Sequence, residues 1–168
     1  MIKIAVNMNN FSASSLANLD RADRDILRIV QKDNQLTHAA IGEEIGLSMS
    51  AVRRRLVALR DGGLISKDVS IINADSVGVT LIVQVSFGED TCEGYQEFDA
   101  HIAKLPNVKQ SYHVSGATDY VLIVQGPSLQ WYEAWAKDSL MSIPAIQRHD
   151  TSVVWSCKKF ETAILIED

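Results

Sequence analysis

The chain has 168 residues, of which 46% are hydrophobic and 22% are charged, and its formal net charge is −5. This composition excludes a chain that is disordered throughout, because it offers enough apolar residues for one ordinary domain or two small ones. It also excludes a membrane span, because the longest apolar runs, such as residues 120–124, are far shorter than the roughly 20 residues that a spanning helix needs.

The charge is divided unevenly along the chain. Residues 1–72 contain ten Lys and Arg against eight Asp and Glu, whereas residues 73–168 contain six against thirteen. The first part is therefore net basic and the second net acidic, which favours two modules with different partners. The basic charge is also concentrated, since one segment carries Arg53, Arg54, Arg55 and Arg60.

Residues 1–18 are small and polar after a short apolar start, and they predict a loose tail. The apolar start is too short for a signal peptide, so we expect the chain in the cytoplasm. Cys92 and Cys157 form no CxxC pair, and two reduced thiols are favoured over a single disulfide bridge.

Three helices are expected between residues 19 and 63. Asp20, Thr37 and either Ser48 or Ser50 are candidate N-caps, because their side-chain oxygens can accept hydrogen bonds from the first turn of a helix. Apolar residues recur at helical spacing after each cap: Ile26, Leu27 and Val30; Ala40, Ile41 and Ile45; Val52, Leu56 and Leu59. A short alternating stretch over residues 64–72 then predicts two small strands or a wing.

From residue 80 the apolar period changes from helical to alternating. Strands are expected over 81–87, 108–114, 119–125 and 146–155, helices over 95–105 and 129–140, and a possible fifth strand over 160–166. The order strand-helix-strand-strand-helix-strand is the split βαβ, or ferredoxin-like, arrangement. Its two helices cover only one face of the sheet, so a second copy of the chain is expected to cover the other.

The predicted fold is therefore α+β. A tail is expected over residues 1–18 and a winged helix-turn-helix domain over 19–72. A linker over 73–79 and a ferredoxin-like βαββαβ domain over 80–168 follow.

Residues 38–57 fit the helix-turn-helix template. Gly46 lies in the turn, where a left-handed backbone is needed, and Gly42 lies where the two helices cross. The third helix would enter the major groove of double-stranded DNA with its N-terminal end first. Its outward residues, and hence the candidate DNA contacts, are Ser48, Met49, Ser50, Arg53 and Arg54. A merely solvated arginine face is the alternative.

The other basic residues of this segment have different expected roles. Arg55 lies on the flank of the buried stripe, so we expect an ion pair with an acid of the first helix more than base contacts. Arg60 and Lys67 could reach flanking phosphates, with a plain surface location as an equal alternative.

Four motifs occur in order along the chain. They are Leu19-Asp20-x-x-Asp23-x-x-Ile26-Leu27; Ile45-Gly46-Leu47-Ser48-x-Ser50-x-Val52-x-x-Arg55-Leu56-x-x-Leu59-x-x-x-Gly63-Leu64-Ile65; Val114-Ser115-Gly116-x-x-Asp119-Tyr120-x-Leu122; and Ile143-Pro144-x-Ile146 with Thr151-Ser152-Val153-Val154. Together they resemble the Lrp/AsnC family. The resemblance implies a bacterial or archaeal transcription regulator that forms dimers, commonly joined into octamers. It also implies a small-molecule effector, usually an amino acid, bound where dimers meet.

The third motif contains the candidate effector loop, which consists of Ser115, Gly116, Ala117, Thr118 and Asp119. Backbone amides in this turn suit a carboxylate, and Asp119 suits an α-ammonium group, although an ordinary hairpin is the alternative. The resemblance adds Thr151 from the closing strand. The chain departs from the family at Ala117, where an acid is frequent, and at 149–151, where His-Asp-Thr replaces a frequent Thr-Arg-Thr.

No metal, cofactor or enzyme site is predicted. The chain lacks the GxxxxGK, GxGxxG and GxSxG motifs, and its four histidines, at positions 38, 101, 113 and 149, have no ligand spacing. Two alternatives stay open: an architectural DNA-binding protein without an effector, and an enzyme resembling siroheme decarboxylases, for which His113 and His149 would be the first candidates. The basic third helix favours a DNA-binding regulator over the enzyme.

Overall fold

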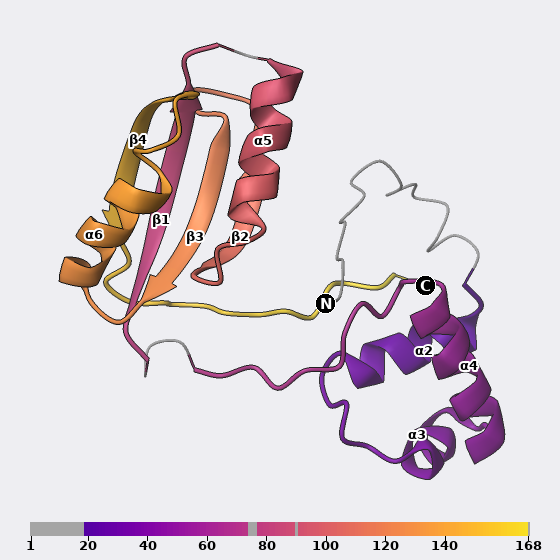
Figure 1. The fold of residues 1–168 in the computed structure, drawn as a ribbon. Helices are drawn as coiled ribbons and strands as arrows, with labels where there is room; N and C mark the ends of the chain where they lie inside the picture. The colour runs from indigo at the N-terminus through magenta and orange to yellow at the C-terminus, as the bar shows by residue number, and fades with distance from the viewer. Residues whose placement is uncertain (1–18, 74–76, 90, 168) are drawn as a thin grey trace. The chain divides into compact units, whose positions relative to one another are not determined.

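The computed structural model describes residues 19–73, 77–89 and 91–167 (Figure 1). The expected tail over residues 1–18 and the middle of the expected linker, residues 74–76, lie outside these ranges. The chain divides into two compact units. The first, here called the reader unit, contains the described residues up to Ser70 together with those from Glu161 onward, and the second runs from Ile71 to Phe160.

The reader unit contains the three expected helices, α2 (Arg21–Val30), α3 (His38–Ile45) and α4 (Met49–Asp61). Each begins at a predicted cap: the side chains of Asp20, Thr37 and Ser48 accept a hydrogen bond from the third amide of their helix at 2.9–3.2 Å. Of the two candidates for α4, Ser48 is the cap. Gly46 ends α3 with a φ of 72°, the left-handed conformation that glycine adopts without strain.

The close crossing of α3 with the chain after its turn depends on Gly42. Gly42 is buried, and its carbonyl oxygen accepts a hydrogen bond from the amide of Leu47 at 2.8 Å. A Cβ atom placed on Gly42 would collide with the carbonyl oxygen of Leu47. The predicted need for a small residue at this crossing is therefore confirmed.

The expected strands or wing over residues 64–72 are wrong, because the structure has no strand there. Leu64 and Ile65 are adjacent rather than alternating, and both pack against the core of the helices. Their amides both donate to the carbonyl oxygen of Leu59 and so continue the end of α4. Residues 66–72 are exposed and pair with no strand in the described part of the chain.

The possible fifth strand over residues 160–166 is also wrong. These residues form no strand, and those from Glu161 onward belong to the reader unit. Ile166 is only 8% exposed and completes the core of the three helices, which contains Ile26, Leu27, Ile41, Val52, Leu56 and Leu59. The tail therefore buries Ile166 in the core of the three helices and does not pair with the sheet.

The second unit has the predicted ferredoxin-like order. Its elements are β1 (Val79–Phe87), α5 (Cys92–Ile102), β2 (Val108–His113), β3 (Tyr120–Gly126), α6 (Leu129–Ser139) and β4 (Ile146–Val153). The strands form one antiparallel sheet in the order β2-β3-β1-β4. Helix α5 begins at Cys92 rather than at the expected residue 95, because Thr91 caps it by accepting from the amide of Gly94 at 3.1 Å.

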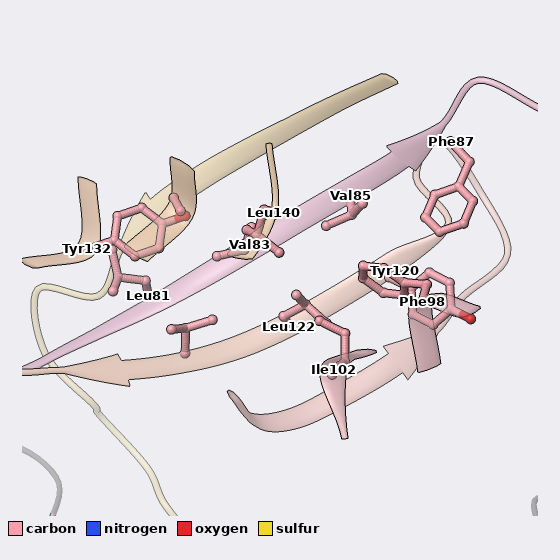
Figure 2. Packing of buried hydrophobic residues seen from close by; sticks show 12 residues of the cluster. Leu81, Val83, Val85, Phe87, Phe98, Ile102, Tyr120, Leu122, Tyr132 and Leu140 are labelled. Atoms are coloured by element: carbon pink, nitrogen blue, oxygen red, sulfur yellow. The ribbon is translucent and has the colours of Figure 1, made fainter. Parts of the chain in front are cut away.

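Both helices pack on one face of this sheet. Figure 2 shows the apolar side chains of β1 and β3 meeting Phe98 and Ile102 of α5, Tyr132 of α6, and Leu140, the residue that caps the C-terminal end of α6. On the other face, Ile82 pairs in register with Ile123, and both side chains are only half-buried. Within the described part of this unit, neither helix covers the second face, as the alternation of the strands predicts.

The variant Gly42→Ala tests the tight crossing. An exposed Gly-to-Ala change in a helix is stabilising, whereas we expect Gly42→Ala to lower the free energy of unfolding by about 2 kcal/mol because the added methyl group must displace the backbone at Leu47. Urea denaturation followed by circular dichroism measures this change. Glu43→Ala, at the exposed neighbouring position, is the control and should stay within about 0.5 kcal/mol of the wild type. Stabilisation by Gly42→Ala would contradict the tight crossing.

Candidate functional site

The N-terminal half of α4 presents the predicted polar face to solvent. Ser48, Met49, Ser50, Arg53 and Arg54 are all exposed, whereas Val52, Leu56 and Leu59 are buried on the opposite side of the helix. The hydroxyl of Ser48 caps the helix and lies 3.1 Å from the hydroxyl of Ser50. This end of the helix therefore combines hydroxyl groups with amides that no helical carbonyl can satisfy, an arrangement that suits a phosphate group.

Arg53 and Arg54 differ from Arg55 and Arg60, the other two arginines of α4, which both have acidic partners. No hydrogen bond or ion pair within the described residues engages either guanidinium group. Both side chains lie on one turn of α4, beside the exposed Met49 and Val57. We call these two arginines uncommitted because their guanidinium groups have no partner within the described residues. Two adjacent groups of this kind can form bidentate contacts with guanine edges or phosphates.

Arg55 is turned the other way, as the sequence predicts. Its Nη1 atom lies 2.7 Å from Oδ2 of Asp20 and 2.8 Å from Oδ1 of Asp23, so it joins α4 to the first turn of α2. The backbone hydrogen bond from Asp23 and then the Arg55 guanidinium hold the pKa of Asp20 below its ordinary value. The two acids in turn raise the pKa of Arg55. The expected ion pair with an acid of the first helix is confirmed.

Arg60 has a partner within the reader unit. Its Nε atom lies 2.9 Å from Oδ2 of Asp68, and both side chains are about half exposed. An exposed pair of this kind contributes only about 0–1 kcal/mol, so a DNA phosphate could replace Asp68 at little cost. Arg60 is therefore a weaker candidate for a DNA contact than Arg53 and Arg54, which have no such partner in the described residues.

The candidate effector loop connects β2 to β3. Ser115, Gly116 and Ala117 are exposed, and Gly116 has a φ of 144°, which favours glycine. Thr118 is turned toward the sheet, where its hydroxyl donates to the carbonyl oxygen of Val85 at 2.7 Å. The loop is thus anchored at its end and exposed at its tip.

Asp119 has structural partners that the sequence did not reveal. Its Oδ2 atom accepts a hydrogen bond from the amide of Phe87 at 2.8 Å, and its Oδ1 atom accepts one from the hydroxyl of Tyr95 at 3.1 Å. The side chain is half-buried and joins the loop to the end of β1 and to α5. A carboxylate oxygen can accept more than one hydrogen bond, so Asp119 can still bind a cationic group.

Thr151 does not meet the effector loop within one chain. Thr151 lies on β4, where it pairs in register with Val83 of β1. Strand β1 therefore separates Thr151 from β3 and from the loop. Its hydroxyl lies 2.6 Å from that of Tyr132 on α6, a contact that the sequence did not predict. Burial raises the pKa of Tyr132, so this hydroxyl stays protonated.

The two candidate catalytic histidines lie on opposite edges of the sheet. His113 is on β2, where its ring stacks on that of Tyr120 at 4.8 Å between centroids, and His149 is on β4. Within the described residues, no group of three or more His, Cys, Asp or Glu could hold a metal ion. No helix in the described ranges is long and apolar enough to cross a membrane.

Two family models match the chain along most of its length. Residues 19–60 match an AsnC-type helix-turn-helix domain, and residues 80–164 match an Lrp/AsnC ligand-binding domain. The first match contains the exposed face of α4, and the second contains both the effector loop and Thr151.

Individual proteins match over nearly the same length. An HTH-type transcriptional regulator of Sinorhizobium fredii is 36% identical over 151 residues, which are 89% of each chain. The transcriptional regulator AzlB of Bacillus subtilis is 32% identical over 152 residues, which are 89% of this chain and 97% of AzlB. Among solved structures, a transcriptional regulator of Neisseria meningitidis in complex with L-Met superimposes with a TM-score of 0.81 at 27% identity, covering 88% of this chain and 96% of the other.

The double contact of Asp119 predicts different outcomes for two substitutions. Asp119→Ala leaves the amide of Phe87 without its acceptor, so we expect it to lower the free energy of unfolding by about 1–3 kcal/mol. Asp119→Asn keeps an oxygen for Phe87 and a polar group for Tyr95, so we expect a loss of less than about 1 kcal/mol. Chemical denaturation of both variants provides the comparison. Equal losses would show that the hydrogen bonds of Asp119 do not stabilise the fold.

Proposed function

We propose that this chain, which belongs to the Lrp/AsnC family, binds specific DNA sequences and changes its DNA affinity or assembly when a small molecule binds. It is a transcriptional regulator with an AsnC-type helix-turn-helix domain and a ligand-binding domain. The observation that carries the proposal is the pair of uncommitted arginines, Arg53 and Arg54, on the exposed face of α4.

In this proposal α4 is the reading helix. Its N-terminal end enters the major groove, where Ser48, Met49 and Ser50 contact the backbone or base edges. Arg53 and Arg54 supply the guanidinium groups that read guanine edges or hold phosphates, and Arg60 exchanges Asp68 for a flanking phosphate. The ion pairs of Arg55 position the helix and make no contact with DNA.

The proposed effector is an amino acid or a related metabolite. The backbone amides of Ser115 to Thr118 suit its carboxylate, and the Asp119 carboxylate suits its ammonium group. The relative from Neisseria meningitidis that contains L-Met supports this class of ligand. Because Thr151 lies beyond β1 from the loop, it would join the site only from another copy of the chain.

The departure from the family at Asp150 has little effect on this site. Asp150 pairs with Gln84 in register, so its side chain faces away from that of its neighbour Thr151. Its carboxylate is also paired, with Oδ2 lying 2.8 Å from Nε of Arg148. Ala117 is the departure that removes charge from the loop itself.

We further propose that the chain acts in the cytoplasm as a homodimer or a higher oligomer such as an octamer. The open face of the sheet, with Ile82 and Ile123 at its centre, supports pairing through this face. A dimer would present two reading helices to two half-sites about one helical turn apart. An architectural DNA-binding protein with no effector is the second candidate. A decarboxylase-like enzyme has less support because His113 and His149 lie at opposite edges of the sheet.

The reading helix is tested by removing both uncommitted arginines. We expect Arg53→Ala with Arg54→Ala to weaken DNA binding at least about 30-fold, because a bidentate arginine contact contributes about 1–3 kcal/mol. The slope of log Kd against log salt concentration should fall by about 1 for each phosphate interaction that the substitutions remove. Fluorescence anisotropy with labelled duplexes over a series of salt concentrations measures both quantities.

A second double variant controls for the change in charge. Arg21→Ala with Lys32→Ala removes the same charge from exposed positions outside α4 and should change the affinity less than about threefold. Equal weakening by the two double variants would contradict the assignment of α4 as the reading helix.

The effector site is tested by melting temperature. A ligand that binds the folded state raises this temperature, so we expect one compound in a panel of the twenty amino acids and related metabolites to stabilise the wild type selectively. Asp119→Asn should lose this shift, because it removes the charge that holds the ammonium group and keeps the hydrogen-bonding positions. A normal shift in Asp119→Asn would remove Asp119 from the site, and no shift from any compound would favour the architectural candidate.

A further inference from the structure

The C-terminal tail, residues 161–167, is docked on α2. The side chain of Gln31 donates from Nε2 to the carbonyl oxygen of Ile164 and accepts at Oε1 from its amide, both at 2.9 Å. The Arg28 guanidinium donates to the carbonyl oxygen of Ile166 from Nε at 3.1 Å and from Nη2 at 2.8 Å. Figure 1 shows the yellow tail reaching the helices of the reader unit, and these hydrogen bonds place it on α2.

These contacts hold the tail as an extended peptide. Gln31 satisfies the amide and the carbonyl of one residue, as a neighbouring strand would do. Ile166 is 8% exposed and packs in the core of the reader unit, whereas Leu165 is 86% exposed and Ile164 is 63% exposed. Docking therefore depends on one buried side chain and four hydrogen bonds to the backbone of the tail.

The docked tail gives the reader unit a second covalent connection to the rest of the chain. The first connection is the segment that follows Ser70, and the second is the segment of residues 154–160 that follows β4. In the reader unit, the second connection ends in the tail that is docked on α2. The start of the same helix forms ion pairs with Arg55 of α4 through Asp20 and Asp23. The tail thus leads from the strand that contains Thr151 to the helix that positions α4.

We propose that the docked C-terminal tail is a tether that presents the two reading helices of a dimer to DNA as a pair. This proposal rests on the proposed DNA-binding function. A unit held by two connections has fewer accessible orientations than a unit held by one, so less orientational entropy is lost when both reading helices bind one duplex. The second helix then binds at a higher effective concentration after the first has bound. Binding of a single reading helix gains nothing from the tether.

The test compares two duplexes for the full-length chain. Both come from the sequence that the wild type enriches from random DNA: one keeps two half-sites, about one helical turn apart, and the other keeps one half-site. Ile166→Asp places a charge in the reader core and so undocks the tail, whereas Leu165→Asp adds the same charge at an exposed neighbour. We expect Ile166→Asp to weaken binding to the two-site duplex about tenfold and to the one-site duplex less than twofold. Leu165→Asp should leave both affinities within about twofold.

Two results would overturn the tether. Equal weakening on both duplexes would mean that the tail supports the fold of the reader unit or contacts DNA itself, and unchanged binding to both would mean that docking has no part in pairing the helices. If Ile166→Asp lowers the helical circular dichroism signal, Gln31→Ala decides instead, because it removes two hydrogen bonds to the tail and leaves the core intact. It should weaken two-site binding about threefold and leave one-site binding unchanged. A wild type that enriches no sequence would contradict the proposed function itself.

Discussion

The proposed reading helix, α4, is joined to α2 by the ion pairs that Arg55 forms with Asp20 and Asp23. Three consecutive arginines cannot face one direction on a helix, because successive side chains are about 100° apart. With Arg55 held against α2 and Val52 and Leu56 buried, Arg53 and Arg54 are left on the exposed face. The same pairs join the start of α2 to α4, and among the arginines of α4 they leave Arg53 and Arg54 without a partner in the described residues.

In the second unit, β1 has the comparable role. It pairs with both β3 and β4 and packs on both helices. It also holds the effector loop through two hydrogen bonds: the Val85 carbonyl accepts from Thr118, and the Phe87 amide donates to Asp119. Asp119 therefore has a structural role as well as a proposed role in binding. A ligand at this carboxylate would act on the contact between the loop and the end of β1, which gives the proposed effector a physical route to the sheet.

Features set by a few neighbouring residues could be predicted from the sequence. The caps at Asp20 and Thr37, the left-handed turn at Gly46 and the alternating strands all follow from local backbone chemistry and period, and so does the ferredoxin-like order. Contacts between distant residues could not be predicted in the same way. The docking of Ile166 in the reader core, the partners of Asp119 and the hydroxyl contact of Thr151 join positions that no spacing rule connects. The expected strands over 64–72 and 160–166 failed for this reason: an alternating pattern forms a strand only where a neighbouring strand is present.

Selection of DNA from a random pool by the purified full-length chain tests the central claim most directly. The account predicts enrichment of one sequence with two related half-sites in dyad symmetry, their centres separated by about one helical turn or a multiple of it. It also predicts that the spacing of the half-sites is retained more strictly than the bases between them. Retention of DNA without any enriched sequence would contradict specific reading by α4 and would favour the architectural candidate.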